Sequence, residues 1–196
     1  GEPWVLERLL DEVEKDRTYF EASGGGVTVS GGEPALQAPF VAAFLAGCRR
    51  RGLHTALDTC GFCAAGALEQ LLPVTDLVLY DLKEIDPERH RRFTGQSNER
   101  IFANLRLVRD RMRAEGCPAR LWLRTPIIPR LTAPADNIAG LVVLVSDGVP
   151  RPPDIPPLAG LSAPRVVVGP GLAHRLTACS KEPRLGHSTV LVVVER

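Results

Sequence analysis

The stretch GGGVTVSGGEP, residues 24–34, decides how this chain is interpreted. Residues 27–30 are typical of a short β-strand, which runs directly into two glycines, an acid and a proline. Because glycine tolerates positive φ and has no side chain, a ligand can approach the backbone of Gly31 and Gly32 closely. Glu33 adds a charged acceptor, which suits the amino group and carboxylate of an amino-acid-like ligand. An ordinary turn has the same composition, so the rest of the chain decides between the two interpretations.

Outward from this stretch, predicted strands and helices alternate. Strands are expected at residues 27–30, 54–58, 76–83 and 119–125, and helices at 4–21, 38–51, 66–72, from 86 onward, at 98–115 and at 133–146. Alternation without hairpin signals predicts an α/β fold with a parallel sheet. Open α/β sheets and α/β barrels build their sites where parallel strands end. We therefore expect one cleft to gather the charged residues that follow the strands, namely Glu33, Asp58, Asp81, Lys83 and Arg124.

The last quarter of the chain has a different character. It is rich in proline and contains two short strand-like runs, at residues 166–168 and 190–194. We therefore predict two regions, an α/β part at residues 1–148 and a divergent, irregular, proline-rich segment at residues 149–196.

Composition excludes several classes of protein. The chain has 196 residues, of which 44% are hydrophobic and 24% charged, as expected for one soluble globular domain. Its net charge of +1 gives no sign of a nucleic-acid or anionic membrane partner, and no apolar run is long enough to span a bilayer. Five cysteines without disulfide-scaffold spacing favour a reducing cytoplasm. The chain begins at Gly1 rather than at methionine, so we expect a fragment or a processed product.

Several ordered motifs together carry a family resemblance. They are GGGVTVSGGEP at residues 24–34, ALDTCGF at 56–62, LVLYDLK at 77–83, HRRFTGQSNERIFANL at 90–105 and LRTPIIP at 123–129. Over about residues 1–148 the chain resembles the glycyl-radical-enzyme activating enzymes, the pyruvate formate-lyase activase branch of the radical S-adenosylmethionine (SAM) superfamily. The resemblance implies a partial (β/α)6 barrel, a [4Fe-4S] cluster and SAM. It also implies an electron donor such as flavodoxin or ferredoxin, and a glycyl radical enzyme as protein substrate.

The implied reaction is reductive cleavage of SAM at the cluster. It yields methionine and a 5′-deoxyadenosyl radical, which takes hydrogen from a glycine of the partner. The resemblance implies that Gly31, Gly32 and Glu33 receive the amino group of SAM. It places Asp58 and Thr59 near the SAM carboxylate, and it implies a monovalent cation there together with the acid that matches Asp81.

Three further residues are assigned to SAM by the same resemblance. Asp81 and Lys83 match an Asp-x-Lys motif that faces SAM, and Arg124 matches an arginine that points toward the site. The physical chemistry agrees, since an acid can hold a cation or hydroxyl and a lysine can pair with a carboxylate. The alternatives are an ion pair at a strand end for Asp81 and Lys83, and for Arg124 a partner role toward Glu33 or Asp81.

The cysteines depart from the family pattern. The family's Cys-x-x-x-Cys-x-x-Cys motif is absent from this sequence, and we expect the first barrel strand to be missing with it. Cys60 and Cys63 form a Cys-x-x-Cys that suggests zinc, iron or a redox pair, although structural cysteines explain it more simply. Residues 154–158 lack the histidine of the family's Leu-Pro-Tyr-His-like motif. We assign no metal ligand and no catalytic residue within this chain.

Three functions follow from these observations. The first is activation of a glycyl radical enzyme, with this chain incomplete and inactive alone. The second is a non-catalytic relic of the same fold that binds SAM or a partner. The third is an unrelated α/β-barrel lyase with Lys83 as a Schiff base, which borohydride trapping would test.

Overall fold

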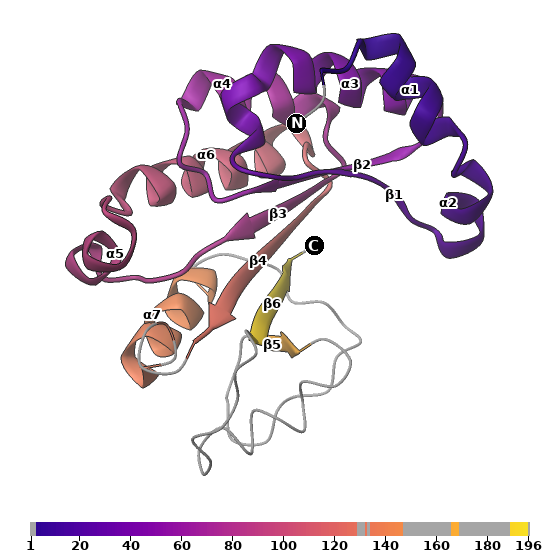
Figure 1. Cartoon of the computed structure of the whole chain (residues 1–196). Helices are drawn as coiled ribbons and strands as arrows, with labels where there is room; N and C mark the ends of the chain where they lie inside the picture. Colours follow the sequence, from indigo (N-terminus) through magenta and orange to yellow (C-terminus); the bar gives the residue numbers. More distant parts are fainter. Residues whose placement is uncertain (1–2, 129–131, 133, 147–165, 169–188, 196) are drawn as a thin grey trace. The chain divides into compact units, whose positions relative to one another are not determined.

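The computed structural model describes residues 3–128, 132, 134–146, 166–168 and 189–195 (Figure 1). The chain divides into two compact units, one formed by residues 1–79 and 100–120, the other by residues 80–99 and 121–196. Most of the segment 149–196 lies outside the described residues, so the boundary expected at residue 148 stays a prediction.

The first unit contains the glycine-rich stretch. Its elements are α1 (Leu6–Glu14), α2 (Arg17–Ser23), β1 (Gly26–Val29), the 3-10 helix η1 (Pro34–Gln37), α3 (Ala38–Arg50), β2 (His54–Thr59), α4 (Ala65–Leu71), η2 (Leu72–Val74), the start of β3 (Leu77–Asp81) and all but the first residue of α6 (Glu99–Glu115). The strand order is β1-β2-β3. Strands β1 and β2 are parallel and pair Gly26 with His54 through Val29 with Leu57, which confirms the parallel arrangement expected from the alternating pattern.

Helices cover one face of β1 and β2 in this unit, as Figure 1 shows for α1, α3, α4 and α6. Helix α3 buries Val41, Phe44, Leu45 and Cys48, which recur at the three- and four-residue spacing of one helical stripe. Leu57 in β2 is completely buried. The helix ends where the sequence predicts, because Gly52 takes a φ of +75° and its N–H bonds the Arg49 carbonyl at 2.9 Å.

The single helix expected at residues 4–21 is wrong, because the chain breaks between α1 and α2. At the break the carbonyl of Asp16 accepts from the N–H groups of Tyr19 and Phe20 and so starts a new helix. Arg17, the first residue of α2, anchors the chain at this break. Its guanidinium pairs with Glu14 and donates to the carbonyl of Arg51, 34 residues away, at 2.5 Å.

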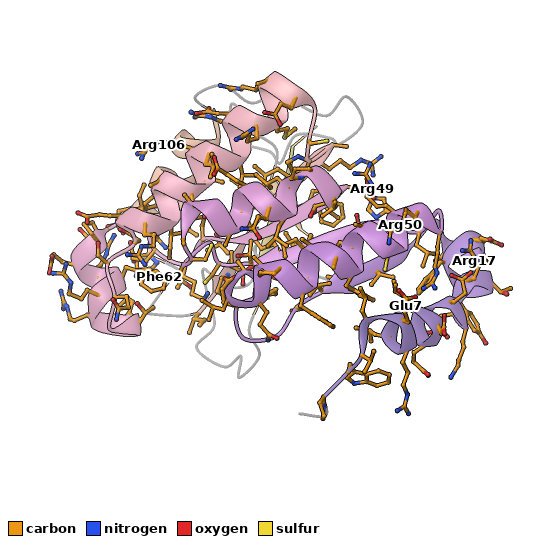
Figure 2. All side chains as sticks on the ribbon, turned by 90° about the horizontal axis from the view of Figure 1, so that it is seen from above. Glu7, Arg17, Arg49, Arg50, Phe62 and Arg106 are labelled. Carbon is orange, nitrogen blue, oxygen red and sulfur yellow. The ribbon has the colours of Figure 1, made fainter. Side chains whose placement is uncertain are left out.

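The basic end of α3 ties this helix to its neighbours. Arg49 donates to the carbonyl of Pro73 at 2.7 Å, and Arg51 lies 3.2 Å from the carboxylate of Asp11 in α1. Figure 2 shows Arg49 and Arg50 at this end of the helix. Arg49 and Arg51 therefore link α3 to other elements of the first unit.

The second unit holds the end of β3, α5 (Pro87–Thr94), β4 (Arg120–Ile127, from Leu121 onward), α7 (Ala135–Ser146), β5 (Val166–Val168) and β6 (Thr189–Glu195). Its strand order is β3-β4-β6-β5, and β6 is antiparallel to both β4 and β5. Helix α5 starts as predicted, because the Asp86 side chain accepts from the Arg89 N–H at 2.7 Å. Within the described residues, no helix combines the length and apolar character that crossing a lipid bilayer requires.

Candidate functional site

Two glycines at the carboxyl end of β1 have the conformation that the sequence suggests. Gly31 has a φ of +95° and Gly32 a φ of +54°. A Cβ atom built on either residue would meet no other atom within 4 Å. Their backbone groups therefore border open space, and only glycine reaches this conformation without strain.

Glu33 connects this glycine turn to the end of β2. It caps η1 by accepting from the Ala35 N–H at 3.2 Å, and the same oxygen, Oε1, accepts from the Thr59 hydroxyl at 2.7 Å. Its other oxygen, Oε2, accepts from the Cys60 N–H at 3.1 Å and from the Cys60 thiol at 3.3 Å. An ionised carboxylate has about four acceptor positions. The structure therefore uses the carboxylate of Glu33 to hold the two strand ends together.

Asp58 lies beside the same glycine turn. Its Oδ2 accepts from the hydroxyl of Ser30, the last residue before Gly31, at 3.1 Å. The Asp58 side chain is half-buried, whereas Thr59 is buried and also accepts, through its hydroxyl, from the Gly61 N–H at 2.9 Å. The predicted residues Gly31, Gly32, Glu33, Asp58 and Thr59 therefore lie together at the carboxyl ends of β1 and β2.

Helix α6 also holds the loop after β2, residues 60–63. Asn104 donates from Nδ2 to the carbonyls of Gly61 at 2.8 Å and Cys63 at 2.9 Å. Arg100, near the start of the same helix, places its guanidinium carbon 5.2 Å from the ring centroid of Phe62, which Figure 2 labels. The loop between the Cys60 and Cys63 thiols is therefore fixed by contacts from Glu33, which follows β1, and from α6.

Cys63 is a buried, inert thiol. Burial raises its pKa to about 12, and the neighbouring charges of Glu33 and Cys60 act in the same direction, while Arg100 opposes them. Because the thiolate is the reactive form, this environment makes Cys63 a poor nucleophile at neutral pH.

In the second unit, Asp81 and Arg124 form an ion pair. Arg124 Nε donates to Asp81 Oδ1 at 2.8 Å, and the Leu82 N–H bonds the Arg124 carbonyl at 2.8 Å. Of the two partners that the sequence left open for Arg124, the structure shows Asp81. Asp81 pairs with Arg124 rather than with Lys83.

Lys83 begins a loop that asparagine side chains fix. Its ammonium has no hydrogen-bond or ion-pair partner among the described residues, while its carbonyl accepts from Asn137 at 3.1 Å. Asn98 donates to the carbonyls of Glu84 at 2.8 Å and Ile85 at 2.9 Å. The backbone of Lys83 is therefore held while its charged end stays available to a ligand.

The same loop contains a buried charge that sequence reasoning missed. The Glu84 side chain is 1% exposed, and its Oε1 pairs with Arg89 at 3.0 Å. Asn98 and Asn104 were also missed as loop anchors, although both fall inside the motif at residues 90–105. A signal for Asn104 exists, because it stands beside Leu105 and three residues after Ile101 on the buried face of α6.

The described cysteines do not fit an iron–sulfur cluster. Cys48 is buried within α3 and Cys63 is buried against Asn104. Among the described residues no three side chains of His, Cys, Asp or Glu gather as metal ligands would. A cluster that leaves one iron open for SAM needs three thiolates at one point, and these cysteines do not supply them.

The predicted residues thus fall into two groups, one in each unit. Gly31, Gly32, Glu33, Asp58 and Thr59 belong to the first unit, whereas Asp81, Lys83 and Arg124 belong to the second. That the two groups share one cleft stays a prediction.

Comparisons with known proteins point to one superfamily. The model of the Radical SAM superfamily matches residues 2–133. The isethionate sulfite-lyase activating enzyme of Oleidesulfovibrio alaskensis is 39% identical over 147 residues, covering 75% of this chain and 46% of that protein. The (2S)-3-sulfopropanediol dehydratase activating enzyme of Klebsiella oxytoca is 39% identical over 138 residues, covering 70% of this chain and 42% of that protein.

A solved structure gives the same picture. The crystal structure of a domain of pyruvate-formate lyase-activating enzyme from Bacteroides vulgatus matches with a TM-score of 0.55 and 31% identity, covering 63% of this chain and 73% of that one. This likeness confirms the predicted α/β fold of the partial radical SAM barrel type. The chain spans less than half the length of the two activating enzymes compared above.

Proposed function

The chain belongs to the radical SAM superfamily, and from this membership we propose that it is the SAM-binding core of an enzyme that activates a glycyl radical enzyme. The observation that carries the proposal is the pair Gly31 and Gly32, with positive φ and open space above both residues. The relatives with similar sequences are activating enzymes for isethionate sulfite-lyase and for (2S)-3-sulfopropanediol dehydratase.

The first unit offers the groups that the amino-acid end of SAM requires. Gly31 and Gly32 are exposed, and their backbone carbonyls would accept from an ammonium group while their N–H groups would donate to a carboxylate. Asp58 adds a carboxylate beside them, which holds a cation or the ammonium itself. The acceptor positions of Glu33 are taken by Ala35, Thr59 and Cys60, so we propose that Glu33 braces the turn. A direct contact between Glu33 and SAM stays a prediction.

The assignment of the second unit rests on motif resemblance. Lys83 is the cation proposed for the SAM carboxylate, and its unpaired ammonium among the described residues supports that role. Asp81 lies 2.8 Å from Arg124, and the opposite charges of this ion pair offset one another.

The proposed reaction is the one that the family resemblance implies. One electron enters SAM, the bond between its sulfur and C5′ breaks, and methionine and a 5′-deoxyadenosyl radical result. The radical takes a hydrogen atom from a glycine of the partner, leaving a glycyl radical and 5′-deoxyadenosine. The family resemblance implies that a [4Fe-4S] cluster would supply this electron, with flavodoxin or ferredoxin as its source. The described cysteines do not fit that cluster, so no step is assigned to them.

A second candidate function is SAM binding without cleavage. The lack of a fitting cysteine set among the described residues favours it for this chain taken alone. Both candidates require the SAM site. They differ in whether the protein generates a glycyl radical in a partner, which electron paramagnetic resonance detects.

Titration calorimetry with SAM tests the proposed site. Gly32→Ala puts a methyl group into the open space and strains the turn, so we expect SAM affinity to fall at least ten-fold. Gly52→Ala is the matched control, because Gly52 also has positive φ and open surroundings but lies at the end of α3. Equal affinities for the wild type and the two variants would contradict the site, and absence of SAM binding by the wild-type protein would contradict the proposed function.

A further inference from the structure

A buried amide on helix α6 holds the loop that follows β2. Asn104 is 4% exposed, and its Nδ2 donates to the carbonyls of Gly61 and Cys63. The same nitrogen lies 3.8 Å from the Cys63 sulfur. Both protons of the amide are therefore used on one loop, 41 and 43 residues away in the sequence.

The loop is held on its other side by the glycine turn. The Glu33 carboxylate accepts from the Thr59 hydroxyl and from the N–H and thiol of Cys60. Thr59 in turn accepts from the Gly61 N–H at 2.9 Å. A chain of hydrogen bonds thus runs from Asn104 through the loop to Glu33, next to Gly31 and Gly32.

We propose that Asn104 is a positioning residue for the ligand site at the end of β1 and β2. Its amide fixes residues 60–63, and this loop fixes the donors that set the orientation of Glu33 and the glycine turn. The ligand part of this inference rests on the proposed SAM function. The part that concerns the loop does not.

The two loop carbonyls depend on the Asn104 amide as their hydrogen-bond donor. Without it, the carbonyls of Gly61 and Cys63 lose their donor, and a buried carbonyl without a partner is costly. The loop then opens toward water to satisfy these oxygens, which exposes the buried Cys63 thiol. Reactivity of Cys63 in the folded protein is therefore a direct reporter of the loop.

The chain supplies a matched control in the second unit. Asn98 is buried like Asn104 and donates to two loop carbonyls, those of Glu84 and Ile85. Asn98→Asp and Asn104→Asp are the same isosteric change, each removing two donors, but they act on different loops.

The experiment measures iodoacetamide labelling of Cys63 at pH 7.5 by site-resolved mass spectrometry, in native protein without SAM. We expect Asn104→Asp to label Cys63 at least ten-fold faster than wild type, and Asn98→Asp to label it at the wild-type rate. Calorimetry with SAM follows, with at least ten-fold weaker binding expected for Asn104→Asp. Asn104→Ser keeps one hydroxyl donor, so its Cys63 labelling rate and its SAM affinity should lie between those of the wild type and Asn104→Asp. This variant replaces Asn104→Asp in both measurements if Asn104→Asp does not fold.

The outcomes separate the two proposals. Wild-type labelling rates in the Asn104 variants would overturn the inference, as would equal acceleration by Asn98→Asp, which would show general loosening. Faster labelling with unchanged SAM affinity would also overturn it, since the loop would then not position the site. If the wild-type protein binds no SAM, the proposed function fails, and the positioning role toward SAM fails with it, while labelling still decides whether Asn104 holds the loop.

Discussion

Gly26 offers a sharp test of how β1 and β2 pack together. It is the first residue of β1 and pairs with His54 in the parallel ladder. A Cβ atom on Gly26 would lie 2.2 Å from the carbonyl oxygen of His54 and 2.8 Å from its carbonyl carbon. These are backbone atoms, so no side-chain rotation relieves the overlap. Gly26→Ala must therefore displace one strand relative to the other.

The size of the effect follows from this geometry. Overpacking that forces backbone shifts costs typically about 1–3 kcal/mol, and a contact this short against backbone places Gly26→Ala near about 3 kcal/mol. For a chain of 196 residues, each kcal/mol lowers the unfolding midpoint by about 2–4 °C. We therefore expect a fall of about 6–12 °C.

Thermal unfolding followed by circular dichroism measures this shift, with urea unfolding as a second probe. Gly66→Ala is the matched control, because Gly66 lies in α4 and an added Cβ meets nothing within 4 Å. Alanine favours helices over glycine by up to about 1 kcal/mol, so this variant should be unchanged or slightly more stable. If Gly26→Ala were as stable as Gly66→Ala, the close pairing of β1 and β2 would be refuted.

Two further predictions concern buried groups. The pKa of Cys63 is raised to about 12, above the unfolded value of about 8.5, so the folded state keeps a proton that the unfolded state loses. Its stabilising contribution is complete below about pH 8.5 and is lost as the pH rises toward 12, at no more than about 1.4 kcal/mol per pH unit. Between these pH values the free energy of unfolding, measured with urea, should therefore fall less steeply with pH in Cys63→Ala than in the wild type. Identical slopes for the two proteins would contradict the raised pKa of Cys63. Arg89→Met should lower the urea midpoint of unfolding by much more than Arg91→Met does. The reason is that Arg89 pairs with the buried Glu84, whereas Arg91 pairs with the exposed Glu88. Equal falls in the midpoint would contradict the buried pair.

Local features of the site were predictable from sequence. Positive φ at Gly31 and Gly32 follows from the absence of a side chain in a turn after a strand, and the structure has it. The position of Asp58 at the end of β2 follows from the alternation of elements. Each of these inferences needs only residues that are neighbours in the chain.

Features that depend on distant contacts were not predictable. The break between α1 and α2 is accompanied by a contact from Arg17 to a carbonyl 34 residues away. The role of Asn104 depends on a loop more than 40 residues away, and composition alone does not tell which loop α6 covers. The choice of Asp81 as partner of Arg124 likewise required the pairing of β3 with β4.

The central claim, that SAM binds at the glycine turn of β1, is tested most directly by nuclear magnetic resonance of the ¹⁵N-labelled protein. Addition of SAM should shift the amide signals of Gly31 and Gly32 in a saturable manner, while those of Gly52 and Gly66 stay in place. Saturable binding of SAM that leaves the signals of Gly31 and Gly32 unmoved would contradict the account.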